Sequence, residues 1–339
     1  MQRLSLGVLV AVHITCAGAT AQSDTLRIVG ARFTGDLPTL VADERDFFQS
    51  AELDAEVEYA FDTSAGLTAL RRGDTDVVLT DMTAFVIDRL QDSTPGEGDD
   101  PVILANLLHG LPDARIAVLR SLGVEKPGDL AGKRLGLTRG TFSDYLWSVF
   151  AAFHGIDGSV DLFDLRFDEI PQALVDGRVD ATVIFEPWEE LEERWQLPLT
   201  TFPSDFILPT HWLVVTTRDA IQQSPDDIAA LLKAYAQASD WIERNPEDAL
   251  TLFAERWGFN TQLYTAAAER LPIFDVTLDW SIYASYREQS AWAAREGHAN
   301  RSENGSFVTA VSTLPLASFS PSSVLLPIAT WPEIVAGVP

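Results

Sequence analysis

A phrase of eight residues occurs twice in this chain, about a hundred residues apart. Ala-Leu-x-x-Gly-x-x-Asp stands at residues 69–76 and again at residues 173–180. In each copy the leucine suits the apolar face of a helix, the glycine suits the left-handed position that ends it, and the aspartate leads into a β-rich run. The runs, residues 77–79 and 181–185, both end in polar or turn residues. The repeat predicts two lobes built on one plan, with a ligand outside the carboxyl ends of the strands.

The first residues predict an export signal. Arg3 precedes an apolar run over residues 4–14, and the small residues Ala19 and Ala21 suit cleavage before Gln22. The run is too short to span a membrane, although a buried N-terminal helix is an alternative. We therefore expect residues 1–21 to be a signal peptide and the mature chain to be periplasmic.

The single cysteine, Cys16, lies inside this predicted signal. A bacterial lipoprotein would carry its lipid on such a cysteine, but Thr15 and His13 stand where a small residue and a leucine are expected. The sequence favours the soluble form over the lipoprotein. A mature chain without cysteine has no disulfide, so its stability depends on core burial.

The formal net charge of −26 excludes some partners. A chain with so few basic residues has no stripe that could replace the counterions of nucleic acid. The acidic surface could attract cationic ligands, or it could be a solvated surface suited to salty surroundings. We favour the solvated surface.

Hydrophobic patterning predicts an α/β chain in two lobes joined by two crossing strands. Strands are expected at residues 25–30, 55–61, 77–79, 102–105, 115–119, 134–137, 181–185 and 212–216. Helices are expected at residues 38–49, 145–154 and 225–244, another follows the N-cap residues 62–66 and ends at Gly73, and the remainder to residue 297 is expected to be mostly helical. Each lobe is expected to hold a mostly parallel sheet flanked by helices. The predicted domains are lobe 1 at residues 24–108 and 214–299, lobe 2 at residues 112–211, and a surface segment with apolar clusters at residues 300–339. Such a pair of lobes can close on a ligand.

Residues 26–297 resemble the periplasmic substrate-binding proteins of ABC transporters, in the nitrate, sulfonate and taurine group. The resemblance rests on the order of short phrases: Leu40-Val41-Ala42-Asp43-Glu44 with Phe47-Phe48, both copies of the repeat, Asp129-Leu130-x-Gly132-Lys133, Gly140-Thr141, Glu186-Pro187, and the segment from Ser320 to Val324. Asp46 departs from the family, which has glycine before the first phenylalanine. The resemblance implies the type II periplasmic-binding-protein fold, a small-molecule solute and an ABC permease as partners, and no cofactor. We expect a monomer.

Two predicted helix N-termini are the first candidates for a binding site. Free N–H groups and hydroxyls at a helix start suit a carboxylate, sulfonate or nitrate, and ordinary capping is the alternative. The candidates are Thr63, Ser64 and Gly66 in the first lobe, and Gly140, Thr141 and Ser143 in the second.

Charged and aromatic residues near the strand ends complete the candidate site. Asp81 and Glu186 could bind an amine or cap a helix, and Arg139 could pair with an anion. Phe33, with Thr34 beside it, and Phe142, Trp188 and Trp212 could form the wall for an apolar or ring-bearing ligand, or could belong to the core. His109 and His211 lie at the presumed crossings, where a structural role is favoured.

Three functions remain open from the sequence. The favoured one is a non-catalytic receptor that binds a small anionic or zwitterionic solute between its lobes. The second is an enzyme on the same scaffold that acts on a cofactor precursor, although the sequence has neither a metal-spaced cluster nor a His-Glu-x-x-His or Gly-x-Ser-x-Gly motif. The third is a sensor input for a signalling partner.

Overall fold

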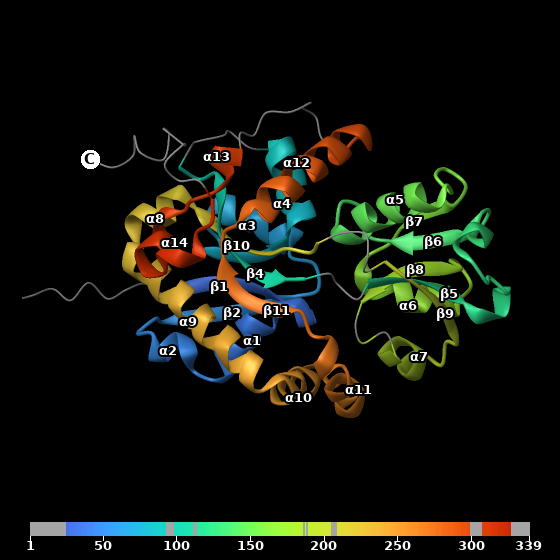
Figure 1. Cartoon of the computed structure of the whole chain (residues 1–339), viewed down its shortest axis with the longest axis horizontal. Coiled ribbons are helices and arrows are strands. Elements are labelled where there is room, and N and C mark those ends of the chain that lie inside the picture. Colours follow the sequence, from blue (N-terminus) through green and yellow to red (C-terminus); the bar gives the residue numbers. More distant parts are fainter. Residues whose placement is uncertain are drawn as a thin grey trace, which may run out of the picture.

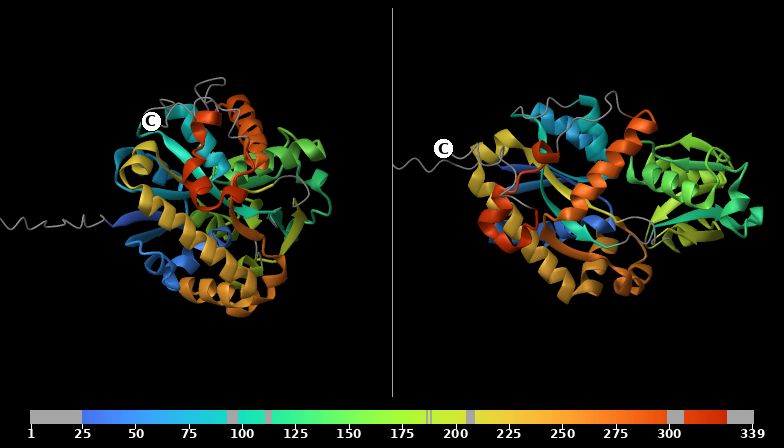
Figure 2. Two further views of the ribbon diagram at one scale, coloured as in Figure 1. Left: turned by 60° about the vertical axis from the view of Figure 1, so that its left-hand side comes forward. Right: turned by 45° about the horizontal axis from the view of Figure 1, so that its top comes forward.

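Two β-sheets with their own helices form two lobes that lie side by side (Figure 1). The computed structural model describes residues 25–92, 98–110, 114–185, 187, 189–204, 209–298 and 307–326. Figure 2 shows the same two bodies from two further directions. We call the lobe around the six-stranded sheet the first lobe and the lobe around the five-stranded sheet the second lobe.

The sheet of the first lobe has the strand order β11-β4-β10-β3-β1-β2. Its strands are β1 (Leu26–Ala31), β2 (Ala55–Ala60), β3 (Val77–Asp81), β4 (Pro101–His109), β10 (Trp212–Thr217) and β11 (Ile273–Thr277). β1 pairs in parallel with β2 and β3, whereas β10 runs antiparallel to β3 and β4, and β11 antiparallel to β4. β3, β4 and β10 are almost wholly buried.

The sheet of the second lobe has the order β7-β6-β8-β5-β9. Its strands are β5 (Ala114–Leu119), β6 (Arg134–Leu137), β7 (Asp161–Asp164), β8 (Ala181–Phe185) and β9 (Leu199–Pro203). β6 pairs in parallel with β7 and β8, and β5 pairs antiparallel with β8 and β9. The predicted two-lobed α/β fold is confirmed, but both sheets are mixed rather than mostly parallel. Strands next to the crossings run against their neighbours because the chain enters and leaves each lobe through them.

Helices cover both faces of the first sheet and flank the second. The first lobe carries α1 (Leu37–Glu44), α2 (Phe47–Ser50), α3 (Ser64–Arg72), α4 (Met82–Asp92), α8 (Arg218–Gln223), α9 (Pro225–Arg244), α10 (Pro246–Trp257), α11 (Thr261–Ala266), α12 (Trp280–Arg295), α13 (Phe307–Ala310) and α14 (Leu314–Phe319). The second carries α5 (Phe142–His154), α6 (Ile170–Val175) and α7 (Glu189–Trp195). α1, α9 and α10 lie on one side of the first sheet, and α3, α4 and α12 on the other (Figure 1). Within the described ranges, no helix has both the length and the apolar character to cross a membrane.

Short 3-10 turns connect several of these elements. They are η1 (Thr34–Asp36), η2 (Arg120–Leu122), η3 (Pro127–Leu130), η4 (Phe167–Glu169), η5 (Ala268–Arg270) and η6 (Pro321–Ser323). Two of these turns lie at the boundary between the lobes: η1 follows β1, and η4 follows β7.

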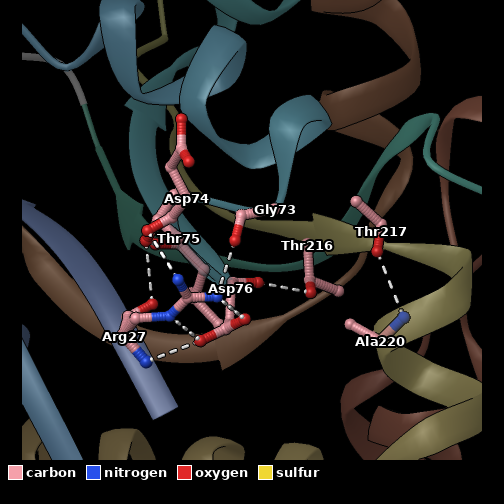
Figure 3. A network of polar contacts seen from close by, with 9 residues as sticks. Arg27, Gly73, Asp74, Thr75, Asp76, Thr216, Thr217 and Ala220 are labelled. Carbon is pink, nitrogen blue, oxygen red and sulfur yellow. Dashed lines mark hydrogen bonds and ion pairs between the residues drawn. The ribbon is translucent and has the colours of Figure 1, made fainter.

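The repeated phrase has the same structural role in both lobes. Gly73 (φ 73°) and Gly177 (φ 65°) take the left-handed conformation that ends α3 and α6. The Asp76 carboxylate accepts a 2.8 Å hydrogen bond from the Arg27 backbone and is ion-paired with its guanidinium at 2.8 Å (Figure 3). Asp180 holds Arg134 in the same way, at 2.8 Å and 2.7 Å. Each aspartate therefore joins the start of its own strand to the start of the parallel neighbour.

Three local predictions are wrong. The helix expected over residues 38–49 is interrupted at Arg45–Asp46, because Asp46 takes a left-handed conformation (φ 55°) between α1 and α2. The strand expected over residues 102–105 is too short, because β4 continues to His109 and its end pairs with the edge strand β11.

The third concerns the apolar clusters predicted on the surface after residue 300. Phe307, Val311 and Leu316 are buried. The backbone of Ser312 donates to Ile103 of β4 at 2.9 Å. The described part of this segment, residues 307–326, therefore contributes side chains to the core of the first lobe.

Candidate functional site: a cleft between the lobes

A cleft between the lobes holds about 760 Å³ of space, part of it open to solvent. Both lobes contribute to its walls, at the carboxyl ends of β1, β3, β6 and β8. The lining residues are Ala31, Arg32, Phe33, Phe61, Asp62, Thr63, Asp81, Thr138, Thr141, Phe142, Ser143, Phe167, Phe185, Thr210 and Trp212. Among them are seven of the predicted site residues: Phe33, Thr63, Asp81, Thr141, Phe142, Ser143 and Trp212.

Aromatic rings form one wall of the cleft and cross the lobe boundary. Phe33 of the first lobe lies 5.4 Å from the Trp212 ring and 5.6 Å from the ring of Phe185 in the second lobe. Phe185 in turn lies 6.3 Å from Phe142 at the start of α5. Three of the four aromatic residues predicted for this wall, Phe33, Phe142 and Trp212, therefore line the cleft, together with Phe185, which sequence patterns assigned only to a strand.

The N-terminus of α5 opens onto the cleft. Gly140 has φ 72°, which only glycine adopts without strain, and Thr141 caps the helix from an extended conformation. The Thr141 hydroxyl donates to the Thr138 carbonyl at 2.8 Å. This loop places Thr141, Phe142 and Ser143 in the wall, at the positive end of a 13-residue helix.

The N-terminus of α3 is already occupied by a carboxylate. Asp62 accepts a 2.9 Å hydrogen bond from the Ser64 backbone, whereas Thr63 makes no side-chain capping bond. Thr63 lines the cleft but Ser64 does not. Gly66 faces the sheet, because a Cβ there would lie 3.0 Å from Val78. The anion site predicted at Ser64 and Gly66 is therefore not present. The Asp62 carboxylate accepts the hydrogen bond from Ser64 that an anion would accept, and Gly66 packs against Val78 of the sheet.

Asp81 both caps a helix and lines the cleft. Its carboxylate accepts hydrogen bonds from the backbones of Thr83 at 2.8 Å and Ala84 at 3.0 Å, at the start of α4. Burial raises the pKa of Asp81 to about 6, and the negative charge of Asp62 adds to the rise. A positively charged group on a ligand would reduce the repulsion between the Asp62 and Asp81 carboxylates.

Arg139 and Gly140 lie behind the cleft rather than in its wall. The Arg139 guanidinium is paired with Asp144 at 3.2 Å, and the Gly140 backbone donates to the same carboxylate at 3.0 Å. Arg139 is thus neutralised within the protein, and the anion contact expected of it is not found. Thr34 lines a neighbouring hollow instead. Glu186 and Trp188 lie outside the described residues.

The family model described as NMT1/THI5 like matches residues 34–249. The chain belongs to the NMT1/THI5-like family. No curated protein sequence matches it.

Solved structures place this NMT1/THI5-like chain in the periplasmic-binding-protein fold. The alkanesulfonate-binding protein SsuA from Xanthomonas axonopodis pv. citri, bound to MOPS, is similar with a TM-score of 0.73 and 15% identity, over 85% of this chain and 98% of that one. The aliphatic sulphonate-binding protein SsuA from Escherichia coli gives 0.69 and 16%, over 82% and 89%. The nitrate-binding protein NrtA from Synechocystis PCC 6803 gives 0.64 and 14%, over 93% and 89%. The fold implied by the predicted resemblance is confirmed.

Two polar groups in the cleft of this NMT1/THI5-like chain lack a polar partner among the described residues. The Arg32 guanidinium lies 4.9 Å from the Phe61 ring and 4.8 Å from the Trp257 ring, and none of the described carboxylates forms an ion pair with it. The Thr210 hydroxyl is buried without a hydrogen bond. Sequence patterns did not single out either residue, nor Phe61 and Phe167. Arg32 and Thr210 lie next to predicted strands, Phe61 ends the strand predicted at residues 55–61, and Phe167 has no sequence signal, because the strand before it, β7, was not predicted.

The two candidate histidines lie where the chain crosses between the lobes. His109 ends β4 and is ion-paired with Asp275 of β11 at 2.9 Å, which raises its pKa. His211 precedes β10, lies 3.0 Å from the Ser281 hydroxyl, and has its pKa lowered to about 4 by burial. Neither lines the cleft. In the described part of the chain, no group of histidine, cysteine and acidic side chains could hold a metal ion.

Proposed function

We propose that this chain is an exported, non-catalytic solute-binding receptor of an ABC importer. It binds a small organic anion or zwitterion between its lobes, closes on it, and delivers it to a permease in the inner membrane. The periplasm is the compartment that this role and the predicted signal peptide require. Family membership and the sulfonate- and nitrate-binding proteins that share the fold support this assignment.

The observation that carries the proposal is Arg32 at the cleft wall, which contacts two aromatic rings but forms no ion pair with a carboxylate of the described residues. A guanidinium placed in this way is well suited to an anionic group on a ligand. The Thr210 hydroxyl and the N-terminus of α5 add neutral donors on the same cleft. Asp62 and Asp81 suit an ammonium group, so the cleft favours a zwitterion over a simple anion.

Isothermal titration calorimetry of the mature protein with taurine, short alkanesulfonates and nitrate tests this function. We expect taurine to bind and Arg32→Gln to weaken its binding by about 10- to 100-fold, the cost of one charged hydrogen bond. Arg178→Gln is the matched control, because Arg178 is exposed and lies just before the start of β8, whereas the cleft is at the end of that strand. If Arg32→Gln and Arg178→Gln bound taurine with equal affinity, Arg32 would not belong to the binding site. Absence of binding by every compound, or turnover of any, would overturn the receptor assignment.

A further inference from the structure

A second hollow opens from the inter-lobe cleft, and we call it the outer chamber. It holds about 1220 Å³ of space, part of it open to solvent. Five residues line both hollows: Arg32, Phe33, Phe61, Phe167 and Phe185. The two hollows are therefore neighbours, and Arg32 lies in the wall of both.

The wall that the first lobe contributes to the outer chamber is a stack of aromatic rings. Phe253 lies 6.0 Å from Phe259 and 5.4 Å from Tyr264, and Phe259 and Tyr264 are stacked at 5.3 Å with their planes only 9° apart. Phe253 and Tyr264 are themselves buried, so the stack forms a firm apolar wall on which an apolar group of a ligand could be buried.

The wall from the second lobe is also apolar. Ile184 belongs to β8, Leu191 and Trp195 belong to α7, and all three line the chamber. Phe167, in η4, remains 42% exposed although it borders both hollows. Exposed aromatic surface next to a binding cleft is unfavourable in water, so a ligand that covers it gains free energy.

Polar contacts between the lobes surround this apolar interior. The Asn260 amide donates to Glu193 at 3.0 Å, and the Asn260 backbone donates to Glu190 at 3.1 Å. Arg194 lies 5.6 Å from the Phe259 ring, and Arg270 is paired with Glu189 at 3.6 Å. An apolar interior with a few polar groups around it is typical of a small-molecule pocket rather than of a poorly packed interface between two lobes.

We propose that the outer chamber is a subsite for a ring-bearing apolar part of the solute, whose charged head lies in the cleft beside Arg32. This inference rests on the proposed function and narrows its ligand from small ions to amphipathic organic molecules. An ion the size of nitrate would leave the aromatic chamber unfilled. A head group joined to a ring through a short linker occupies both hollows.

Calorimetry with taurine and N-cyclohexyltaurine tests this subsite, because the two compounds share a head and differ by one ring. We expect N-cyclohexyltaurine to bind the wild-type chain at least about tenfold more tightly, from the burial of the ring. Trp195→Ala should remove most of that gain and leave taurine affinity unchanged. Trp280→Ala is the matched control, since Trp280 is 54% exposed and lines neither hollow. Leu191→Ala, which changes a residue that lines only the outer chamber, provides a second test should Trp195→Ala fold poorly.

The outcomes separate the two proposals. Taurine binding without a gain from the ring overturns the subsite and leaves the receptor function in place. A Trp195→Ala variant that weakens both compounds equally also overturns it, because the chamber would then not be a separate subsite. Failure of both compounds to bind overturns this inference together with the head-group assignment on which it rests.

Discussion

Asp36 is a buried carboxylate beneath the cleft. It is 1% exposed and accepts 2.6 Å hydrogen bonds from the Ala31 backbone and the Thr39 hydroxyl. Burial raises its pKa from 3.8 to about 7, because the charged form loses more hydration than two hydrogen bonds return. The unfolded chain releases this proton near pH 4 and the folded chain near pH 7. The ionisation of Asp36 therefore lowers the free energy of unfolding as the pH rises from about 4 to about 7.

The pH dependence of Asp36→Asn measures this cost. We expect wild type to lose a few kcal/mol relative to the variant between pH 4 and pH 7, at about 1.4 kcal/mol for each unit of pKa shift. Urea unfolding across that range gives the difference, and other titrating groups cancel between the two proteins. Asp157→Asn changes an exposed turn residue, so its free energy of unfolding should vary with pH as that of wild type does. If the free energy of unfolding of Asp36→Asn also varied with pH as wild type does, Asp36 would already be ionised in the folded state at the acidic end of the range.

Asp46 separates α1 from α2 in an unfavourable backbone conformation. Its φ of 55° lies in the left-handed region, where a side chain other than that of glycine is strained. The side chain is exposed and makes no capping bond to α2. The break allows Phe48 to turn into the core, where its ring meets Tyr235 of α9 at 5.8 Å.

Asp46→Gly is expected to stabilise the chain by about 0.5–1 kcal/mol, although glycine usually destabilises. Relief of the left-handed strain exceeds the entropy that glycine adds to the unfolded chain. Thermal unfolding measures the change. Ala51→Gly is the control, because Ala51 has φ −87° and gains no such relief, so it should lower the stability. A loss of stability in both variants would contradict the assignment of strain to Asp46.

The two lobes are joined on the α5 side by a small latch, made of Asp144, Tyr145, Trp292 and His298. The His298 imidazole lies 2.9 Å from the Asp144 carboxylate, and the Tyr145 and Trp292 rings are 5.2 Å apart. Asp144 also accepts from Gly140, so the latch is continuous with the loop that lines the cleft. Together with the contacts of Asn260 on the opposite side, it holds the lobes close around the cleft.

His298→Ala is expected to open the molecule. Loss of the contact with a buried carboxylate should cost about 1–3 kcal/mol of stability, and small-angle X-ray scattering should show a larger radius of gyration. His154→Ala, a change on α5 outside the latch, should leave the radius unchanged. An unchanged radius for His298→Ala as well would mean that the latch does not set the separation of the lobes.

Local sequence patterns predicted most of the central strands, several helix ends and three residues of the cleft wall in the second lobe. Gly73 and Gly177 end their helices as predicted, because a left-handed residue between a helix and a strand depends only on neighbouring residues. Thr141, Phe142 and Ser143 reach the cleft because a strand-to-helix loop in an α/β lobe opens at the carboxyl end of the strand. The break at Asp46 was missed because the apolar spacing continues across it and only the backbone conformation reveals the interruption.

Contacts between distant segments decided the rest. Arg139 was predicted to pair with an anion, but it is paired with Asp144, and Arg32 is the arginine that lines the cleft. Phe61, at the end of a predicted strand, and Phe167 carry no local sign of a binding role, and only the packing of the two lobes brings them to the same hollows. Hydrophobic period and turn chemistry act over a few residues, so they specify strands, helices and their ends. Which charges meet across the lobes depends on how two separate cores pack against each other, and only the tertiary structure determines that.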